Sequence, residues 1–268
     1  MALFGFIGAG NMGYPLIQAA GNTFGKAEVV FTDASQERCQ LVNKETQVPF
    51  VKENIDVVKQ CKYLVLAVKP QFFTIVLEEI KASITKEHIV ISIAAGITIT
   101  TLKEILGDTI RIVRAMPNTP AMVYKGMTGI SYSQDKYSDL EKTEIDRFFR
   151  SFGKYEVFDE KLMNAVVCAS GSSPAYVYMF IEALADSVVA YGIPRDKAYV
   201  LAAQTVLGAA TMVLETGEHP GRLKDNVCSP GGTTIAAVKA LEEYGLRNAI
   251  MKATDACYDK AVDLSKKL

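Results

Sequence analysis

The feature that most restricts the fold is a glycine-rich loop near the start of the chain, placed between an apolar strand and a helix. Residues 3–7 form a short apolar run, Gly8-Ala9-Gly10-Asn11-Met12-Gly13 follows, and residues 14–20 have a helical pattern. This is the order of the GxGxxG loop in dinucleotide-binding folds. The first glycine permits a tight turn, the second lets the backbone approach a pyrophosphate, and the third allows close packing of helix on strand. The loop therefore predicts a Rossmann-type domain.

A second predicted strand, residues 28–32, ends at Asp33. An acidic residue at this place usually accepts a hydrogen bond from the adenosine ribose 2′-hydroxyl and repels a 2′-phosphate. NADH is therefore expected to be accepted, or even preferred, and Arg38 is the nearby residue that could offset the charge of Asp33. The alternative is that Asp33 serves as the N-cap of a helix over residues 35–43.

The alternation of strands and helices continues to about residue 160. Buried-type strands are expected at residues 63–68, 88–93 and 110–116, and later strands at 126–132 and 154–158, around a charged helix at 138–152. Each of the first three ends in small or turn-forming residues, at the edge where open α/β sheets bind ligands. The predicted first domain is therefore a dinucleotide-binding domain spanning residues 1–160.

The pattern of residues 161–268 predicts helices only. Two predicted helices, 174–189 and 195–216, are apolar on nearly every side, and two later ones, 235–244 and 247–267, are amphipathic. Helices without a polar face need more cover than a small domain provides, so we expect the same helices of a second subunit to pack against them. The alternative is a helical bundle buried against its own first domain. The predicted fold class is α/β, a Rossmann-type domain followed by an all-α dimerisation domain.

A second glycine-rich stretch, residues 223–235, leads into one of these helices. It ends Ser229-Pro230-Gly231-Gly232-Thr233-Thr234-Ile235. A turn of this kind leaves backbone N–H groups free at a helix N-terminus, where the helix dipole also favours an anion. The stretch thus predicts a binding site for a carboxylate or phosphate, called the anion seat below. The alternative is an ordinary turn in which Thr233 or Thr234 caps the helix.

Composition narrows the class of function. Hydrophobic residues make up 49% of the 268-residue chain. The net charge is −1, so the chain has no overall positive charge to attract nucleic acid or an anionic membrane. We find no apolar run of about 18 residues and expect a cytoplasmic protein without a membrane segment. The five cysteines form no CxxC pair, and the two histidines, His88 and His219, have no partners at metal or triad spacing. No metal site is expected, and both histidines are interpreted as structural or solvent-facing.

Several motifs together resemble those of the pyrroline-5-carboxylate reductase family. They are the loop at residues 8–13, Ala67-Val68-Lys69-Pro70, Ala94-Ala95-Gly96, residues 114–120, residues 170–176 and the stretch 223–235, in order over nearly the whole chain. The resemblance implies reduction of L-1-pyrroline-5-carboxylate to L-proline by NADPH or NADH, the last step of proline synthesis. It also implies a homodimer formed through the C-terminal helices, with dimers sometimes assembled into larger rings.

The resemblance also implies site residues. The cofactor-binding residues it implies are Ile7, Gly8, Ala9, Gly10, Asn11, Met12, Asn54, Ala67, Val68, Lys69, Pro70, Ala95 and Asn226, to which the position after the second strand adds Asp33. The predicted substrate-binding residues are Glu160, Ser229, Gly232, Thr233 and Thr234. The Thr234 hydroxyl is the candidate catalytic group, which hydrogen-bonds the ring nitrogen or passes it a proton. Members of this family often prefer NADPH, so Asp33 is a departure from the family pattern.

Two other functions fit parts of the sequence. β-Hydroxyacid dehydrogenases share the glycine loop and a helical second domain, but need a lysine on the helix after a glycine-rich turn. The corresponding helix here, after Gly171, has no lysine before Lys197. A dinucleotide-sensing module that only dimerises would need no second anion seat. Oxidation of reduced cofactor in the presence of pyrroline-5-carboxylate separates all three.

Overall fold

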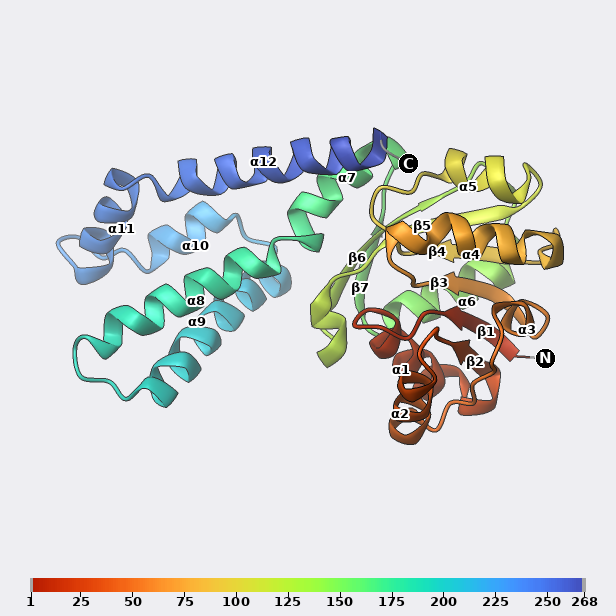
Figure 1. Ribbon diagram of the computed structural model, residues 1–268. Helices are drawn as coiled ribbons and strands as arrows, with labels where there is room; N and C mark the ends of the chain where they lie inside the picture. Colours follow the sequence, from red (N-terminus) through yellow and green to blue (C-terminus); the bar gives the residue numbers. More distant parts are fainter. Residues whose placement is uncertain (1, 267–268) are drawn as a thin grey trace. The chain divides into compact units, whose positions relative to one another are not determined.

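The computed structural model describes residues 2–266 as two compact units (Figure 1). Unit 1 comprises the residues up to Ser172 together with those from Cys257 onward, and unit 2 is Ser173–Ala256. The predicted end of the last helix, residue 267, lies outside the described residues, as do the outermost ends of the two predicted domains, residues 1 and 268.

Unit 1 is built on a seven-stranded sheet with the order β2-β1-β3-β4-β5-β6-β7. Its strands pair in parallel except for β5 and β6, which are antiparallel. The strands are β1 (Ala2–Ile7), β2 (Val29–Thr32), β3 (Cys61–Leu66), β4 (Ile89–Ser92), β5 (Arg111–Met116), β6 (Gly126–Tyr132) and β7 (Gly153–Val157).

Helices cover both faces of the sheet. They are α1 (Gly13–Phe24), α2 (Gln36–Thr46), α3 (Asn54–Val58), α4 (Phe73–Ile80), α5 (Ile99–Leu106) and α6 (Asp139–Arg150). Alternate residues of β3 enter two separate cores: Tyr63 and Val65 pack with α1, α2 and α6, whereas Leu64 packs with α3, α4 and α5. A strand buried on both faces explains the continuous apolar run that predicted it.

The segment between residues 161 and 172 packs with unit 1. Helix α7 (Met163–Val166) lies against β6, where any side chain at Gly129 would collide with Val166. A π-helical turn follows at Val167–Gly171, closed by a bond from the Ser172 N–H to the Val167 carbonyl. The compact units therefore divide after Ser172, and the predicted domain boundary between residues 160 and 161 stays a prediction.

Unit 2 is entirely helical. It contains α8 (Pro174–Val189), α9 (Arg195–Thr216), α10 (Pro220–Asn226), α11 (Thr233–Glu243) and most of α12 (Leu246–Lys266). This arrangement, a Rossmann-type domain followed by a helical one, confirms the predicted fold class.

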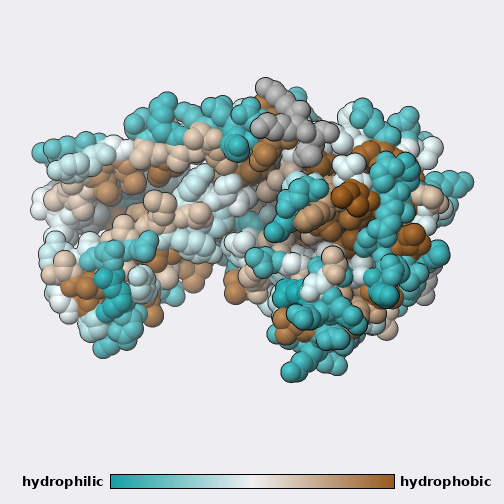
Figure 2. All heavy atoms as spheres, in the orientation of Figure 1, coloured by the Kyte–Doolittle hydropathy of each residue, from teal (hydrophilic) through white to brown (hydrophobic). Residues whose placement is uncertain are grey.

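The apolar side chains of α8 and α9 are mostly uncovered within the chain. Among the described residues of unit 2, the core cluster of fully buried apolar residues consists of three alanines, Ala185, Ala198 and Ala202. Larger residues such as Met179 and Val200 are both 69% exposed. Figure 2 shows hydrophobic residues on the surface of these helices. Burial of this surface requires a further partner, in line with the predicted subunit contact.

Helix α9 is long and apolar enough to cross a membrane by length and composition. This differs from the expectation that no such segment exists. Only 11% of its most apolar window is buried inside the chain. One such helix is weak evidence for a membrane span, because a helix that packs against another subunit has the same composition.

Candidate active site

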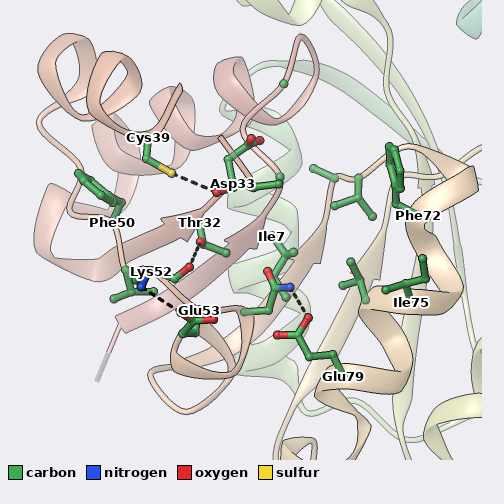
Figure 3. A pocket seen from close by; sticks show the side chains of 18 of the residues that line it. Ile7, Thr32, Asp33, Cys39, Phe50, Lys52, Glu53, Phe72, Ile75 and Glu79 are labelled. Atoms are coloured by element: carbon green, nitrogen blue, oxygen red, sulfur yellow. Dashed lines mark hydrogen bonds and ion pairs between the residues drawn. The ribbon is translucent and has the colours of Figure 1, made fainter. Parts of the chain in front are cut away.

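A cavity of about 840 Å³ lies over the carboxyl ends of β1, β2 and β3 in unit 1. Because β1 lies between β2 and β3, the strand order changes direction here, and open α/β sheets bind ligands at this point. Figure 3 shows Phe50 and Lys52 on one side of the cavity and Phe72 and Ile75 on the other. Its lining residues are Ile7, Gly8, Gly10, Thr32, Asp33, Ala34, Gln36, Cys39, Phe50, Val51, Lys52, Glu53, Asn54, Ala67, Val68, Lys69, Phe72, Ile75, Val76 and Glu79.

The three glycines of the loop lack a side chain for different reasons. Gly8 has a φ of +101°, and a Cβ there would lie 2.7 Å from the Ala67 carbonyl oxygen. A Cβ at Gly13 would collide with the Gly8 carbonyl. A Cβ at Gly10 would meet nothing within 4 Å, so no neighbour within the chain requires this glycine. The bare backbone at Gly10 faces the cavity and fits the close approach of a dinucleotide pyrophosphate.

Asp33 holds the glycine loop through its carboxylate. Oδ2 accepts a hydrogen bond of 2.7 Å from the Ala9 N–H, and Oδ1 accepts one of 3.0 Å from the Ser35 N–H. The N-cap of α2 is Ser35, whose hydroxyl accepts from the Arg38 N–H. The alternative prediction that Asp33 is the N-cap is therefore wrong, since Ser35, two residues further along the chain, caps the helix.

Arg38 holds the same loop from the other side. Its Nε donates to the Ala9 carbonyl oxygen at 2.6 Å, and its guanidinium lies over the ring of Tyr14, 5.3 Å from the ring centre. Ala9 is fully buried, with its N–H bound by Asp33 and its carbonyl by Arg38. The loop conformation is thus fixed by two side chains that follow β2.

The far end of the cavity carries an amide and an apolar wall. Asn54 donates from Nδ2 to Oε2 of Glu79 at 2.8 Å, which orients the amide at the start of α3 (Figure 3). Phe72 is 52% and Ile75 69% exposed, although both are large apolar residues. Apolar side chains left open on a cavity wall suit a flat aromatic ligand such as a nucleotide base.

Sequence reasoning missed this apolar wall. Phe72, Ile75 and Val76 follow Lys69-Pro70 at spacings that bring them to one side of a helix. That spacing could have indicated an apolar cavity wall. It did not distinguish one, because helices that only cover a sheet usually have the same pattern.

The predicted cofactor residues fall into two groups. Those that line the cavity are Ile7, Gly8, Gly10, Asp33, Asn54, Ala67, Val68 and Lys69. Those outside the lining are the buried Ala9, its loop neighbours Asn11 and Met12, Pro70, the half-buried Ala95 after β4, and Asn226, exposed at the end of α10 in unit 2. Contacts of both groups with a cofactor stay predictions.

Glu160, predicted to bind substrate, makes two hydrogen bonds within unit 1. Its Oε1 accepts from the Ile99 N–H at 2.6 Å, at the start of α5, and from the buried guanidinium of Arg114 at 3.2 Å. The carboxylate therefore stabilises the end of the loop that carries Ala95. Both bonds use Oε1, so Oε2 is the oxygen with which a substrate contact would be made.

The predicted anion seat lies at the N-terminus of α11 in unit 2. Gly231 has a φ of +70°, and Gly232 is the N-cap, with no side-chain hydrogen bond at the cap. The alternative prediction, that Thr233 or Thr234 caps the helix, is therefore wrong, because the helix already begins at Thr233. The first-turn N–H groups are left for another acceptor, while Ser229 and Thr233 are exposed and Thr234 is half-buried.

The described residues contain no group of three or more His, Cys, Asp or Glu side chains that could hold a metal ion. His88 is buried, with Nε2 3.1 Å from the Val58 carbonyl oxygen, and His219 caps α10 through Nδ1. Cys39 lines the cavity, where burial raises the pKa of its thiol. A thiol held protonated is a poor nucleophile.

Comparison with known proteins identifies the family. The model for pyrroline-5-carboxylate reductase dimerisation matches residues 160–264, and that for NADP oxidoreductase, coenzyme F420-dependent, matches residues 3–96. The pyrroline-5-carboxylate reductase of Escherichia coli is 45% identical over 265 residues, which is 98% of each chain. The chain belongs to the pyrroline-5-carboxylate reductase family.

Other relatives agree with this assignment. The pyrroline-5-carboxylate reductase of Methanosarcina acetivorans is 40% identical over 265 residues and 98% of each chain. A solved structure of a pyrroline-5-carboxylate reductase from Coxiella burnetii superposes with a TM-score of 0.90 at 35% identity, covering 98% of both chains. The crystal structure of the Plasmodium falciparum enzyme with NADP bound has a TM-score of 0.88 at 31% identity and the same coverage. Family membership selects imine reduction over the hydroxyacid dehydrogenase and the sensing module.

Proposed function

We propose that this protein reduces L-1-pyrroline-5-carboxylate to L-proline with NADPH or NADH as the hydride donor, in the final step of proline biosynthesis. The observation that carries the proposal is the 45% identity to the Escherichia coli pyrroline-5-carboxylate reductase over 98% of the chain. The cavity in unit 1, with its glycine loop and the bare backbone at Gly10, supports a dinucleotide as the partner in the reaction.

The chemistry needs few protein groups. A cyclic imine accepts a hydride at its C=N carbon and a proton at its nitrogen, and the reduced nicotinamide supplies the hydride when bound. The task of the chain is to hold the two reacting atoms close together and aligned. No strong base is needed, which agrees with a site built from backbone N–H groups and hydroxyls rather than histidines.

The substrate carboxylate is proposed to bind at the N-terminus of α11. The N–H groups of the first turn, from Thr233 onward, carry the partial positive charge of the helix, while the Gly232 N–H donates to the Ser229 carbonyl oxygen at 3.0 Å. Ser229 and Thr233 would add polar contacts, chiefly through the main chain for Thr233. Thr234 is placed to hydrogen-bond the ring nitrogen and to pass it a proton.

Two further residues complete the proposed site. Asn226, at the end of α10, is proposed to contact the cofactor near its nicotinamide, and Glu160 to contact the substrate through Oε2. Ala95, in the loop that Glu160 stabilises, is proposed to lie at the nicotinamide.

The protein is proposed to work as a homodimer formed through its C-terminal helices, in the cytoplasm, with dimers assembling into a larger ring. The dimerisation model over residues 160–264 and the exposed apolar residues of α8 and α9 support the subunit contact. The net charge of −1 supports a small-molecule partner rather than nucleic acid or an anionic membrane surface.

The test is a spectrophotometric assay with purified full-length protein. Pyrroline-5-carboxylate should cause loss of reduced cofactor, with one proline formed for each cofactor oxidised. The control substrates are β-hydroxyacids with the oxidised cofactor, which should give no reaction. Turnover of the hydroxyacids without imine reduction would contradict the proposal.

A further inference from the structure

We infer that the cavity selects NADH over NADPH, and that Asp33 is the residue that sets this selectivity. The inference rests on the proposed function in that the cavity is taken to bind the reduced cofactor. It goes further by naming which of the two dinucleotides the chain is built to use.

The first observation is the position of the carboxylate. Asp33 directly follows β2 and lines the cavity, at the place where a dinucleotide-binding fold receives the adenosine ribose. Bonds of 2.7 Å and 3.0 Å from the Ala9 and Ser35 N–H groups hold both of its oxygens in place. A carboxylate has about four acceptor positions, so each oxygen can still accept a ribose hydroxyl.

The same two bonds fix the carboxylate at the edge of the cavity. Each of its oxygens is held by one backbone N–H, so the group has little freedom to turn away. Removal of the carboxylate from the cavity would break its bond to the buried backbone of Ala9. A 2′-phosphate at this ribose would therefore face a negative charge that cannot move aside.

The second observation is that Arg38 binds the glycine loop and Tyr14 rather than facing the cavity. A guanidinium after β2 is the usual receptor for a 2′-phosphate. Here Nε donates to the Ala9 carbonyl at 2.6 Å and the guanidinium stacks on Tyr14, and Arg38 is not among the residues that line the cavity. The one arginine close to Asp33 in the sequence thus serves the loop rather than the ligand.

The third observation is the charge of the lining. The carboxylates that line the cavity are Asp33, Glu53 and Glu79, whereas its cations are Lys52 and Lys69. Lys52 lies 3.9 Å from Glu53 and its side chain is 91% exposed, so it is a weak and solvated counter-charge. The carboxylates of the cavity lining thus outnumber its cations, which disfavours a phosphate that adds close to two negative charges.

The experiment measures binding and turnover separately. Dissociation constants for NADH and NADPH are obtained by titration of the full-length protein, and kcat/KM for each with pyrroline-5-carboxylate. NADH should be favoured by about tenfold or more in both measurements, since juxtaposed like charges cost more than a factor of ten. Asp33→Asn and Asp33→Ser should shift both ratios toward NADPH by about the same factor.

Glu53→Gln is the matched control, because it removes a lining carboxylate whose side chain is 61% exposed, and it should change the ratio far less than Asp33→Asn. Equal or tighter binding of NADPH by the unmodified protein would overturn the inference, and so would an unchanged ratio in both folded Asp33 variants. The comparison in the unmodified protein needs no variant to fold. Selective binding of NADH without imine reduction would instead contradict the proposed function and leave the inference standing.

Discussion

Gly10 and Gly13 lie in the same loop, yet the structure requires only one of them for folding. A Cβ at Gly13 would collide with the Gly8 carbonyl, whereas a Cβ at Gly10 would point into open space. The fold therefore requires the glycine at position 13 and not the one at position 10, where close approach of a pyrophosphate is proposed, and the two positions can be tested separately.

Gly10→Ala should leave the unfolding temperature unchanged or slightly raised and should weaken binding of the reduced cofactor by about tenfold or more. Gly13→Ala should lower the free energy of unfolding by roughly 1–3 kcal/mol, because the added methyl displaces backbone. Thermal unfolding and cofactor titration of both variants provide the measurements. Unweakened cofactor binding by Gly10→Ala would contradict the assignment of this loop to the pyrophosphate.

At the other glycine-rich turn, the helix begins with two threonines whose roles differ in the proposal. Thr234→Ala should lower kcat about 100-fold, the lower range for loss of a proton-transfer group, and leave cofactor affinity unchanged. Thr233→Ala is the matched control, since only its main chain is expected to act. Steady-state assays with saturating cofactor and varied substrate concentration separate kcat from KM. Equal effects of the two substitutions would assign Thr234 to the helix start rather than to the chemistry.

Buried thiols provide a residue-scale test of the core. Burial raises the pKa of Cys61 to about 12, and burial with the neighbouring Cys257 thiol raises that of Cys168 to about 11. Both should resist alkylation by iodoacetamide at pH 8 in the folded protein and react fully after denaturation, because the thiolate is the reactive form. Mass spectrometry of the labelled peptides provides the readout. Rapid labelling of Cys61 in folded protein would show that β3 is not buried as described.

At the scale of elements, α6 shows how the chain fixes a helix that covers the sheet. Ser138 and Glu141 form a capping box: the Glu141 N–H donates to the Ser138 hydroxyl at 3.3 Å, and the Ser138 N–H donates to Glu141 Oε2 at 2.9 Å. Oε1 of Glu141 also accepts from Arg111 at 2.7 Å. One carboxylate thus joins the start of α6 to the start of β5.

The charge state of Glu141 makes this junction sensitive to acid. Burial by itself would raise the pKa of Glu141, but the Ser138 N–H and the Arg111 guanidinium lower it below the ordinary 4.5. A folded-state pKa below the unfolded one stabilises the fold above about pH 4.5, and this contribution is lost as pH falls through the folded value. Glu141→Gln should therefore cost about 1–3 kcal/mol of unfolding free energy at pH 7 and much less at pH 3.

Denaturant unfolding of both proteins between pH 7 and pH 3 measures this difference. The control is Glu78→Gln, whose ion pair with Lys81 is about half exposed, with side-chain exposures of 51% and 45%, and which should cost little at either pH. A loss for Glu141→Gln that is the same at both pH values would contradict the ionic role.

The sequence predicted the strands of unit 1 to within two residues, and the signal was strongest for β2, β3 and β4, which are mainly apolar runs followed by turn residues. The largest shift is at β3, which begins at Cys61 and ends at Leu66, whereas residues 63–68 were expected. Ala67 still donates its N–H to the Ile7 carbonyl, so the backbone bonding to β1 continues one residue past the end of the strand. The direction of β6, antiparallel to β5, has no signal in its own residues.

Helix α10 was not predicted, since Pro220 and Gly221 read as a loop. Proline is tolerated at the first position of a helix, where its missing N–H has no partner to lose, and the His219 ring supplies the cap. In the candidate site, the glycines and Asp33 could be read from the sequence because their spacing is fixed by one loop. The contacts of Glu160 with Ile99 and Arg114 could not, because residues 46 to 61 positions apart meet only through the sheet.

At the scale of the whole molecule, the apolar surface of unit 2 implies that a single chain is not the working form. Met179→Glu or Val200→Glu places a charge on a side chain that is 69% exposed in the single chain and proposed to be covered in the dimer. Either should shift the protein from dimer to monomer in sedimentation experiments, because an unpaired charge in an apolar interface is costly. Leu140→Glu, on α6 of unit 1 and 63% exposed, is the control and should leave assembly unchanged. Dimers that persist in both unit 2 variants would assign the contact to another surface.

One anion-binding site in each unit is proposed to serve the same reaction: a dinucleotide site at the glycine loop and a carboxylate site at the start of α11. The most direct measurement is a crystal structure of the full-length protein with bound cofactor and proline. The proline carboxylate should bind to the backbone N–H groups of Thr233 and Thr234, with the proline ring against the nicotinamide. Proline bound at any other place, or away from the nicotinamide, would contradict the proposed site.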